Sequence, residues 1–374
     1  TRFVIVGGGP SGLAAAYEAS AHGAAAVVLE KLDRVGGGKP FGHLEQEACN
    51  PLLGALDQKH HMLLDPVQFA SGTPNRGIVI VGETASGKSA LAHHLARHFD
   101  GEIVAADSRT IYEGMDIGTA KLSVEERKGI PHHLLDVVDV KTDVTVAWYQ
   151  EIARAKIDEL LVANKPVVVV GGTGFYIKAI LDDLNFPETN PEIRAKIEAE
   201  AEEIGGAALH KRLAVLDPAA AVAIPKENVR RVVRALEVIE ITGKPFTANL
   251  PREDSTRYPK AQQFGLRMDR SDLDQRIDLR VERMWELGLE AEVEKLIGEG
   301  LLEGKTAQAA LGYAQIISAS LGLSVDAKTD TKIATRQYAR RQETWFTRDA
   351  RISWLEPAPL EVRLERVLAS IIKS

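Results

Sequence analysis

Residues 78–89 read IVIVGETASGKS, a short apolar run that passes into a glycine-rich turn and then into a helical pattern. Positions 82–89 match the G-x-x-x-x-G-K-[ST] pattern, in which successive backbone N–H groups point at one anion. The pattern leaves the phosphate compound open, because kinases, ATPases and some transferases share it. It predicts a phosphate site with magnesium on the Ser89 hydroxyl and phosphate contacts from Gly82, Thr84, Ala85, Ser86, Gly87, Lys88 and Ser89.

Outward from this turn, apolar runs recur at 103–106 and 167–170, with helical patterns between them. That alternation predicts an α/β fold, a P-loop-type parallel sheet flanked by helices. Residues 191–241 are expected to be helical throughout, and 272–301 and 331–350 to be two further amphipathic helices. The predicted core therefore spans 77–190 and 250–374, with an all-helical insertion at 191–249.

Residues 3–30 read as strand, glycine turn, helix and strand. Gly7, Gly9, Gly12 and Glu30 fit a dinucleotide-binding fingerprint, and the stretch resembles the opening of flavin-dependent oxidoreductases. A flavin domain needs several more strands, yet the phosphate turn starts about forty residues later. We therefore interpret residues 1–38 as a βαβ fragment or fusion remnant that binds no flavin, and 39–76 as a linker.

The composition is that of a globular protein, with 45% apolar and 26% charged residues among 374. One cysteine, Cys49, excludes a disulfide framework and a multi-cysteine metal site within the chain. The apolar runs are too short to span a bilayer. Glycines interrupt the first apolar run, so it does not have the layout of a signal peptide. We expect a cytoplasmic monomer. The net charge of −7 argues only mildly against a nucleic-acid partner, because the placement of basic residues matters more than their sum.

Several blocks beyond the phosphate turn resemble the signature of tRNA dimethylallyltransferases and keep that family's order from about residue 77 to 355. They include 106–109, 114–121, 129–133, 171–176, 230–238, 242–245, 312–313 and 340–346. The resemblance implies transfer of a dimethylallyl group from dimethylallyl diphosphate to the exocyclic amine of the adenine 3′ of the tRNA anticodon. Diphosphate would be released, and the phosphate turn would hold it together with Mg²⁺ rather than ATP.

The resemblance also implies catalytic roles. Lys88, Ser89 and Thr173 would stabilise the departing diphosphate as negative charge builds on its oxygens. Asp107, at the end of a core strand, would take the proton of the attacking amine. The alternatives for Asp107 are a helix cap or a magnesium ligand.

The tRNA anticodon stem-loop would need a positive surface beside the cavity, because the target base must be extruded to react. The helix at 331–350 is locally basic and carries interleaved aromatic residues. The resemblance and this charge pattern together assign tRNA contacts to Asp107, Ser108, Arg109, Thr110, Arg194, Arg230, Arg231, Arg234, Arg340 and Arg341.

Four positions depart from the family pattern. Glu83 stands where proline is usual, Thr110 where glutamine is frequent, and Ala314-Gln315 replaces Lys-Glu. Two other functions stay open: allyl transfer to free adenine nucleotides, and a flavin-binding fusion protein with an inert transferase part. The helical insertion and the basic helix favour tRNA over a small nucleotide, which needs neither.

Overall fold

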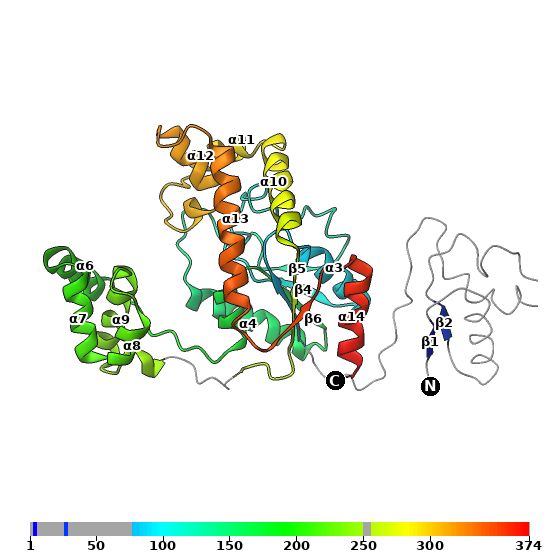
Figure 1. The fold of residues 1–374 in the computed structure, drawn as a ribbon, viewed down its shortest axis with the longest axis horizontal. Coiled ribbons are helices and arrows are strands. Elements are labelled where there is room, and N and C mark those ends of the chain that lie inside the picture. The colour runs from blue at the N-terminus through cyan, green and yellow to red at the C-terminus, as the bar shows by residue number, and fades with distance from the viewer. Residues whose placement is uncertain (1–2, 6–25, 29–76, 250–255, 374) are drawn as a thin grey trace, which may run out of the picture. The chain divides into compact units, whose positions relative to one another are not determined.

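The computed structural model describes residues 3–5, 26–28, 77–249 and 256–373 (Figure 1). The chain forms two compact units, Thr1–Ala70 and Ser71–Ser374. In the first, strands β1 (Phe3–Ile5) and β2 (Ala26–Val28) pair in parallel, with Phe3 opposite Ala26. Both strands agree with the expected βαβ pattern. Gly7, Gly9, Gly12, Glu30 and the linker 39–76 lie outside the described residues.

The second unit is built on a six-stranded sheet in the order β5-β4-β6-β3-β7-β8. Every neighbouring pair is parallel, so the carboxyl ends of all six strands meet at one edge. This confirms the predicted parallel α/β sheet. The strands are β3 (Gly77–Gly82), β4 (Glu102–Ala105), β5 (His132–His133), β6 (Val167–Val170), β7 (Gln262–Leu266) and β8 (Ile352–Leu355).

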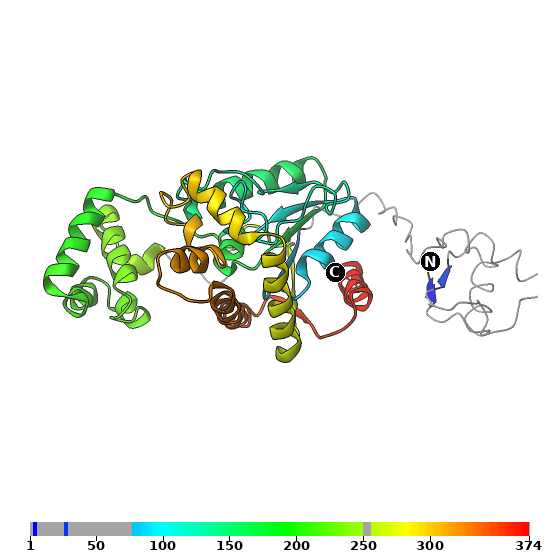
Figure 2. The same ribbon diagram turned by 90° about the horizontal axis from the view of Figure 1, so that it is seen from above.

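Helices cover both faces because successive strand residues point to opposite sides. Ile78 and Ile80 pack with α3 (Lys88–Phe99) and α14 (Leu360–Lys373), which lie side by side in cyan and red in Figure 2. Val79 and Val81 pack on the other face with α4 (Val146–Val162) and α5 (Gly174–Leu181). The central strand is therefore buried on both sides.

The insertion is all-helical, as predicted, and short breaks divide it into separate helices. Its helices enclose a core of their own that contains Ile197, Leu213 and Val232. Gly205 adopts a φ of 82° and separates the first two helices, while the Asp217 side chain caps the third. The elements are α6 (Pro191–Ile204), α7 (Gly206–Leu216), α8 (Pro218–Ala223), α9 (Val229–Thr242) and the 3₁₀ turn η1 (Phe246–Asn249).

A second helical layer follows β7. The helix expected over 272–301 is two helices, because Gly288 takes a φ of 93° between them. The helix expected over 331–350 starts earlier, where the Asp326 side chain caps it, and packs along the first of these helices (Figure 1). No described helix is long and apolar enough to span a bilayer. The elements are α10 (Arg270–Glu286), α11 (Leu289–Gly298), η2 (Ala307–Ala309), α12 (Tyr313–Ser320) and α13 (Ala327–Phe346).

Candidate active site

The phosphate turn connects β3 to α3 at the carboxyl edge of the sheet. Gly87 precedes α3 with a φ of 94°, a backbone conformation that residues other than glycine rarely adopt. The Lys88 ammonium group folds back and donates to the Glu83 carbonyl oxygen. Burial, and then the nearby Arg280, lower the pKa of Lys88 to about 7, although Asp107 and Glu83 oppose the shift. An anion between Lys88 and Arg280 would restore the charge of the lysine.

The Glu83 side chain is directed toward the helical layer. It is only 6% exposed and pairs with Arg270 of α10, at 3.6 Å between Oε1 and Nη1. Burial and the neighbouring Glu343 raise the pKa of Glu83 to about 7, and Arg270 reduces that shift. The residue that departs from the family pattern therefore lies beside α10 and α13 and is absent from the lining of the cavity described below.

A second glycine-rich loop, residues 171–174, follows β6 and touches the end of β4. A Cβ at Gly171 would lie 1.9 Å from the Ala106 carbonyl oxygen, so only glycine allows this approach. Across the contact, the Ser108 amide donates to the Thr173 hydroxyl at 3.3 Å. The Arg109 amide donates to Asp107 Oδ1 at 2.8 Å. Adjacent parallel strands thus bring the predicted Asp107 and Thr173 to one edge, as the sequence predicts.

Gln342 of α13 connects the two loops. Its Oε1 accepts from the Thr84 amide and its Nε2 donates to the Gly172 carbonyl, both at 2.8 Å. Gln342 is 4% exposed, and its bond to Gly172 is buried while its bond to Thr84 is partly buried. Tyr338, one turn earlier, also donates to Gly172, at 3.5 Å. The Thr84 amide, a predicted phosphate donor, is therefore engaged by Gln342. The sequence predicts Tyr338 only as one of the aromatic residues of the tRNA-contacting helix, and it assigns no role to Gln342.

Arg280 of α10 is a further site residue that the sequence does not reveal. Its guanidinium donates to the Thr84 hydroxyl at 3.2 Å, and burial lowers its pKa. The amphipathic pattern of 272–301 predicts a helix but not which of its arginines faces the phosphate turn. The contact joins residues 196 positions apart in the chain, a distance that local patterns do not bridge.

These loops and helices line an open cavity of about 150 Å³ at the carboxyl edge. Ligands of parallel α/β sheets gather at this edge. The Thr110 hydroxyl has no hydrogen-bond partner among the described residues. An apolar cavity of about 150 Å³ lies at the opposite edge, beside Gly77, and has no convergent catalytic groups. The polar side chains that line the first cavity are those of Thr84, Lys88, Ser89, Asp107, Thr110, Thr119, Lys121, His132, Arg280, Tyr338 and Gln342.

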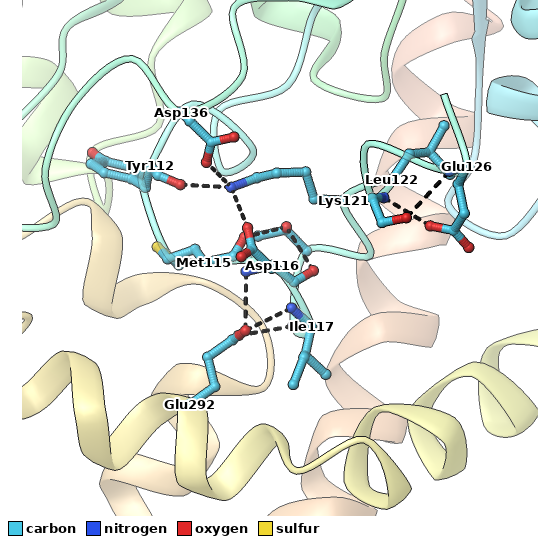
Figure 3. Close-up of polar contacts among 12 residues, drawn as sticks. Tyr112, Met115, Asp116, Ile117, Lys121, Leu122, Glu126, Asp136 and Glu292 are labelled. Carbon is cyan, nitrogen blue, oxygen red and sulfur yellow. Dashed lines mark hydrogen bonds and ion pairs between the residues drawn. The ribbon is translucent and has the colours of Figure 1, made fainter. Parts of the chain in front are cut away.

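Residues 114–121 form a wall segment of which 119–121 line this cavity, and Lys121 fixes the path of that segment. Its ammonium group is shared by the Tyr112 carbonyl at 2.8 Å and the carboxylates of Asp116 and Asp136 at 2.7 and 2.5 Å (Figure 3). The side chain is only 3% exposed. A buried cation with two carboxylates is well compensated, so Lys121 is better suited to hold the wall than to bind substrate.

Glu292 of α11 holds the same wall from outside. Its carboxylate accepts from the backbone N–H groups of residues 116, 117 and 118, at 3.1, 2.8 and 3.2 Å (Figure 3). The Tyr313 hydroxyl, at the start of α12, donates to the same carboxylate. Three amide N–H groups and one hydroxyl stabilise the negative charge of Glu292. These four hydrogen bonds attach the wall segment to the helical layer.

A magnesium ion fits the residues present. Among the described residues no group of three or more His, Cys, Asp or Glu side chains could enclose a metal. Mg²⁺ in phosphate-binding enzymes keeps water ligands and adds one or two protein oxygens and the phosphates of the substrate. The Ser89 hydroxyl and the Asp107 carboxylate both line the cavity and offer such oxygens.

The predicted tRNA-binding arginines fall into two groups. Arg230, Arg231, Arg340 and Arg341 are exposed, and Arg341 lies over the Tyr338 ring, 5.8 Å from its centroid. The others are engaged within the protein.

Arg194 and Arg234 both pair with Glu237, at 2.7 and 2.8 Å. The Glu237 side chain is fully buried in α9. Arg109 donates to the Thr306 carbonyl. Each of these three arginines therefore has a structural partner.

Two family models match different parts of the chain. Residues 110–349 match the model described as IPP transferase. Residues 5–42 match the model of an NAD(P)-binding Rossmann-like domain.

Similar proteins agree with the longer match. The chain is 53% identical over 289 residues to the tRNA dimethylallyltransferase of Streptomyces avermitilis, covering 77% of this chain and 92% of that protein. It is 56% identical over 285 residues to the enzyme of the same name from Thermobifida fusca, covering 74% and 89%.

Solved structures show the same likeness. A tRNA isopentenylpyrophosphate transferase from Bacillus halodurans superposes with a TM-score of 0.58 at 34% identity, covering 80% of this chain and 97% of that one. A eukaryotic dimethylallyltransferase acting on tRNA gives 0.66 at 26% identity, covering 77% and 75%.

Proposed function

The chain belongs to the IPP transferase family, and from that premise we propose that it is a tRNA dimethylallyltransferase. It transfers a dimethylallyl group from dimethylallyl diphosphate to the exocyclic amine of the adenine 3′ of the tRNA anticodon. A carbon–nitrogen bond forms at the allylic carbon, the carbon–oxygen bond to diphosphate breaks, and the amine loses a proton. The observation that carries this proposal is one cavity lined by Lys88, Ser89, Asp107 and Arg280.

The diphosphate is held by the phosphate turn and by two cations. Backbone N–H groups around Gly87 and the amino end of α3 favour an anion. Burial, and then the positive charge of Arg280, lower the pKa of Lys88, and an anion between the two side chains would oppose that shift. As the carbon–oxygen bond breaks, negative charge grows on the diphosphate, and donors already in place stabilise it without rearrangement. Thr173 would add a hydroxyl contact from the second loop. A bound magnesium ion, on Ser89, would neutralise part of the same charge.

Asp107 accepts the proton from the amine. Because its Oδ1 already accepts from the Arg109 amide, the carboxylate has one orientation and its other oxygen is left for the substrate. Lys88 lies close enough to Asp107 for the Asp107 charge to raise the pKa of Lys88. The proton acceptor is therefore near the residue that binds the leaving group.

The tRNA reaches the cavity by extruding the target adenine from the anticodon loop. The Thr110 hydroxyl, which has no partner among the described residues, is available to an edge of that base. Arg230, Arg231, Arg340 and Arg341 are exposed and suit phosphate contacts, while Arg194 and Arg234 would need to leave Glu237 to make them. The enzyme would act as a monomer in the cytoplasm.

The decisive experiment is transfer of radiolabelled dimethylallyl from its diphosphate to unmodified tRNA, with AMP as the parallel acceptor. Label on the tRNA alone is the expected result. Label on AMP would assign the chain to the enzymes that act on free nucleotides. No label on either acceptor would contradict the proposal.

Asp107→Asn tests the assigned proton acceptor. We expect kcat to fall by about 100-fold or more, the size of a general-base contribution, with little change in pyrophosphate affinity. The control is Asp100→Asn, at a carboxylate that is 94% exposed. Equal losses of turnover and of magnesium-dependent pyrophosphate binding would instead make Asp107 a metal ligand.

A further inference from the structure

Arg363 of the last helix, α14, contacts the phosphate turn through the backbone of Ser86. The residue is 5% exposed, and its guanidinium donates to three backbone carbonyl oxygens. These are the carbonyls of Ser86 in the phosphate turn at 3.4 Å, Arg267 after β7 at 2.5 Å and Glu356 after β8 at 3.3 Å. One side chain therefore ties the turn to the ends of two neighbouring strands. Arg363 also lies beyond residues 110–349, the part that the IPP transferase model matches.

The charge of Arg363 lacks a counter-ion in the part of the chain that the structure describes. No carboxylate among the described residues forms an ion pair with it. Burial lowers its pKa, and the nearby Arg276 and Arg366 lower it further. Burying a cation without an anionic partner is costly, even when carbonyl dipoles surround it. An anion bound in the phosphate turn would supply the missing opposite charge.

The geometry of one peptide links Arg363 to that anion. The Ser86 carbonyl and the Gly87 N–H belong to the same planar unit, and the described peptide bonds are all trans. In a trans peptide these two groups point in opposite directions. A donor on the carbonyl therefore holds the N–H on the opposite side of the peptide, at the residue that precedes α3 and is followed by the cavity-lining Lys88 and Ser89. A cation at the carbonyl also polarises the unit, and hydrogen bonds in such a chain strengthen each other.

We propose that Arg363 is a positioning residue that orients the Ser86–Gly87 peptide and raises the affinity of the phosphate turn for the substrate diphosphate. The proposal rests on the function proposed above. Anchoring of α14 does not require the guanidinium, because Val367 and Ile371 already pack that helix into the apolar core. Three carbonyl bonds at the carboxyl edge, one of them inside the turn, favour a role in ligand binding over a role in helix docking.

The test compares three variants of the full chain. Arg363→Met keeps the apolar stem and removes the charge and all donors. Val367→Ala loosens α14 at a fully buried position without touching the phosphate turn. Arg366→Met removes an exposed charge from the same helix. The measurements are the thermal unfolding midpoint of each variant and, at a temperature well below the lowest midpoint, the Kd of magnesium pyrophosphate by titration calorimetry and KM for each substrate.

We expect Arg363→Met to weaken pyrophosphate binding about tenfold, the range of one hydrogen bond to a charged group, and to raise KM for dimethylallyl diphosphate but not for tRNA. Val367→Ala should lower the unfolding midpoint with an unchanged Kd. Arg366→Met should leave the unfolding midpoint unchanged and Kd within twofold of the unaltered chain. An unchanged Kd in Arg363→Met, or an equal loss in Val367→Ala, would overturn the role of Arg363. If the unaltered chain failed to bind pyrophosphate, the proposed function itself would be contradicted.

Discussion

At the residue scale, the phosphate turn contains two side chains whose pKa values are both close to 7. Burial raises the pKa of Glu83 and lowers that of Lys88. Below pH 7 the turn therefore holds a neutral Glu83 and a charged Lys88, the combination that suits an anion. Above pH 7 both changes oppose anion binding, because Glu83 becomes negative while Lys88 loses its charge.

Glu83→Gln should therefore bind pyrophosphate more tightly than the unaltered chain above pH 7, by up to about tenfold at pH 8.5, and equally at pH 6. Titration calorimetry gives the Kd of each protein at each pH. The ratio of the Kd of the unaltered chain to that of Glu83→Gln at the same pH is independent of the protonation of pyrophosphate itself, because both proteins bind the same ligand. Glu343→Gln, which removes a carboxylate farther from the turn, is the matched control and should shift the ratio less. A ratio that stayed constant from pH 6 to 8.5 would show that Glu83 does not titrate in this range.

Some site residues could be predicted from sequence and others could not. Lys88, Asp107 and Thr173 each follow the end of a strand, so a local pattern together with the parallel sheet predicts where they lie. Arg280 and Gln342 contact Thr84 across 196 and 258 positions of the chain. Their place depends on how α10 and α13 pack, and no local pattern encodes that packing.

At the element scale, the helices of the insertion are joined by one buried carboxylate. Glu237 of α9 accepts from Arg194 of α6, from Arg234 and from the Asn190 amide. Arg234 donates in addition to the Pro187 carbonyl, at 2.7 Å. Burial alone would raise the pKa of Glu237, but the bonds from Arg234, Arg194 and Asn190 lower it overall. The ionised form therefore stabilises the fold.

Glu237→Gln should lower the free energy of unfolding by about 1–3 kcal/mol, the cost of removing a charged partner from such bonds. Because the folded pKa is depressed, this contribution is fully present above the unfolded pKa of 4.5 and is lost as pH falls through the folded pKa, which lies below that value. Urea unfolding at pH 7 and pH 4 measures it. Glu240→Gln, on the same helix but with a side chain 32% exposed, should cost less than 1 kcal/mol. Equal costs in the two variants would contradict a special role for Glu237.

The elements that sequence reasoning missed are short or polar. β5 has two residues, β7 reads QQFGL and β8 reads ISWL, so none presents the sustained apolar run that marks β3 and β6. These strands form because an existing parallel edge offers backbone partners, which is a tertiary effect. The break at Gly288 shows the converse case, where one residue with a positive φ divides a continuous amphipathic pattern.

At the scale of the whole molecule, two units with different relatives share one chain. The unit Ser71–Ser374 contains every residue assigned to the reaction. The unit Thr1–Ala70 contains the match to an NAD(P)-binding Rossmann-like domain, which ends at residue 42. A parallel pair such as β1 and β2 is one part of such a domain, and the glycines of the fingerprint, Gly7, Gly9 and Gly12, lie outside the described residues.

A chain that starts at Ser71 should therefore keep kcat and both KM values within about twofold of the full chain, because its catalytic groups, its sheet and its insertion all lie within that unit. Transfer of labelled dimethylallyl to tRNA measures this. The matched control is Gly9→Val in the full chain, where a side chain would obstruct a dinucleotide at the glycine turn. A loss of activity in both proteins would mean that a bound dinucleotide supports the reaction. A loss in the truncated chain alone would mean that the first unit supports the transferase through contacts rather than through a cofactor. Unchanged activity in both would assign the reaction to the unit Ser71–Ser374.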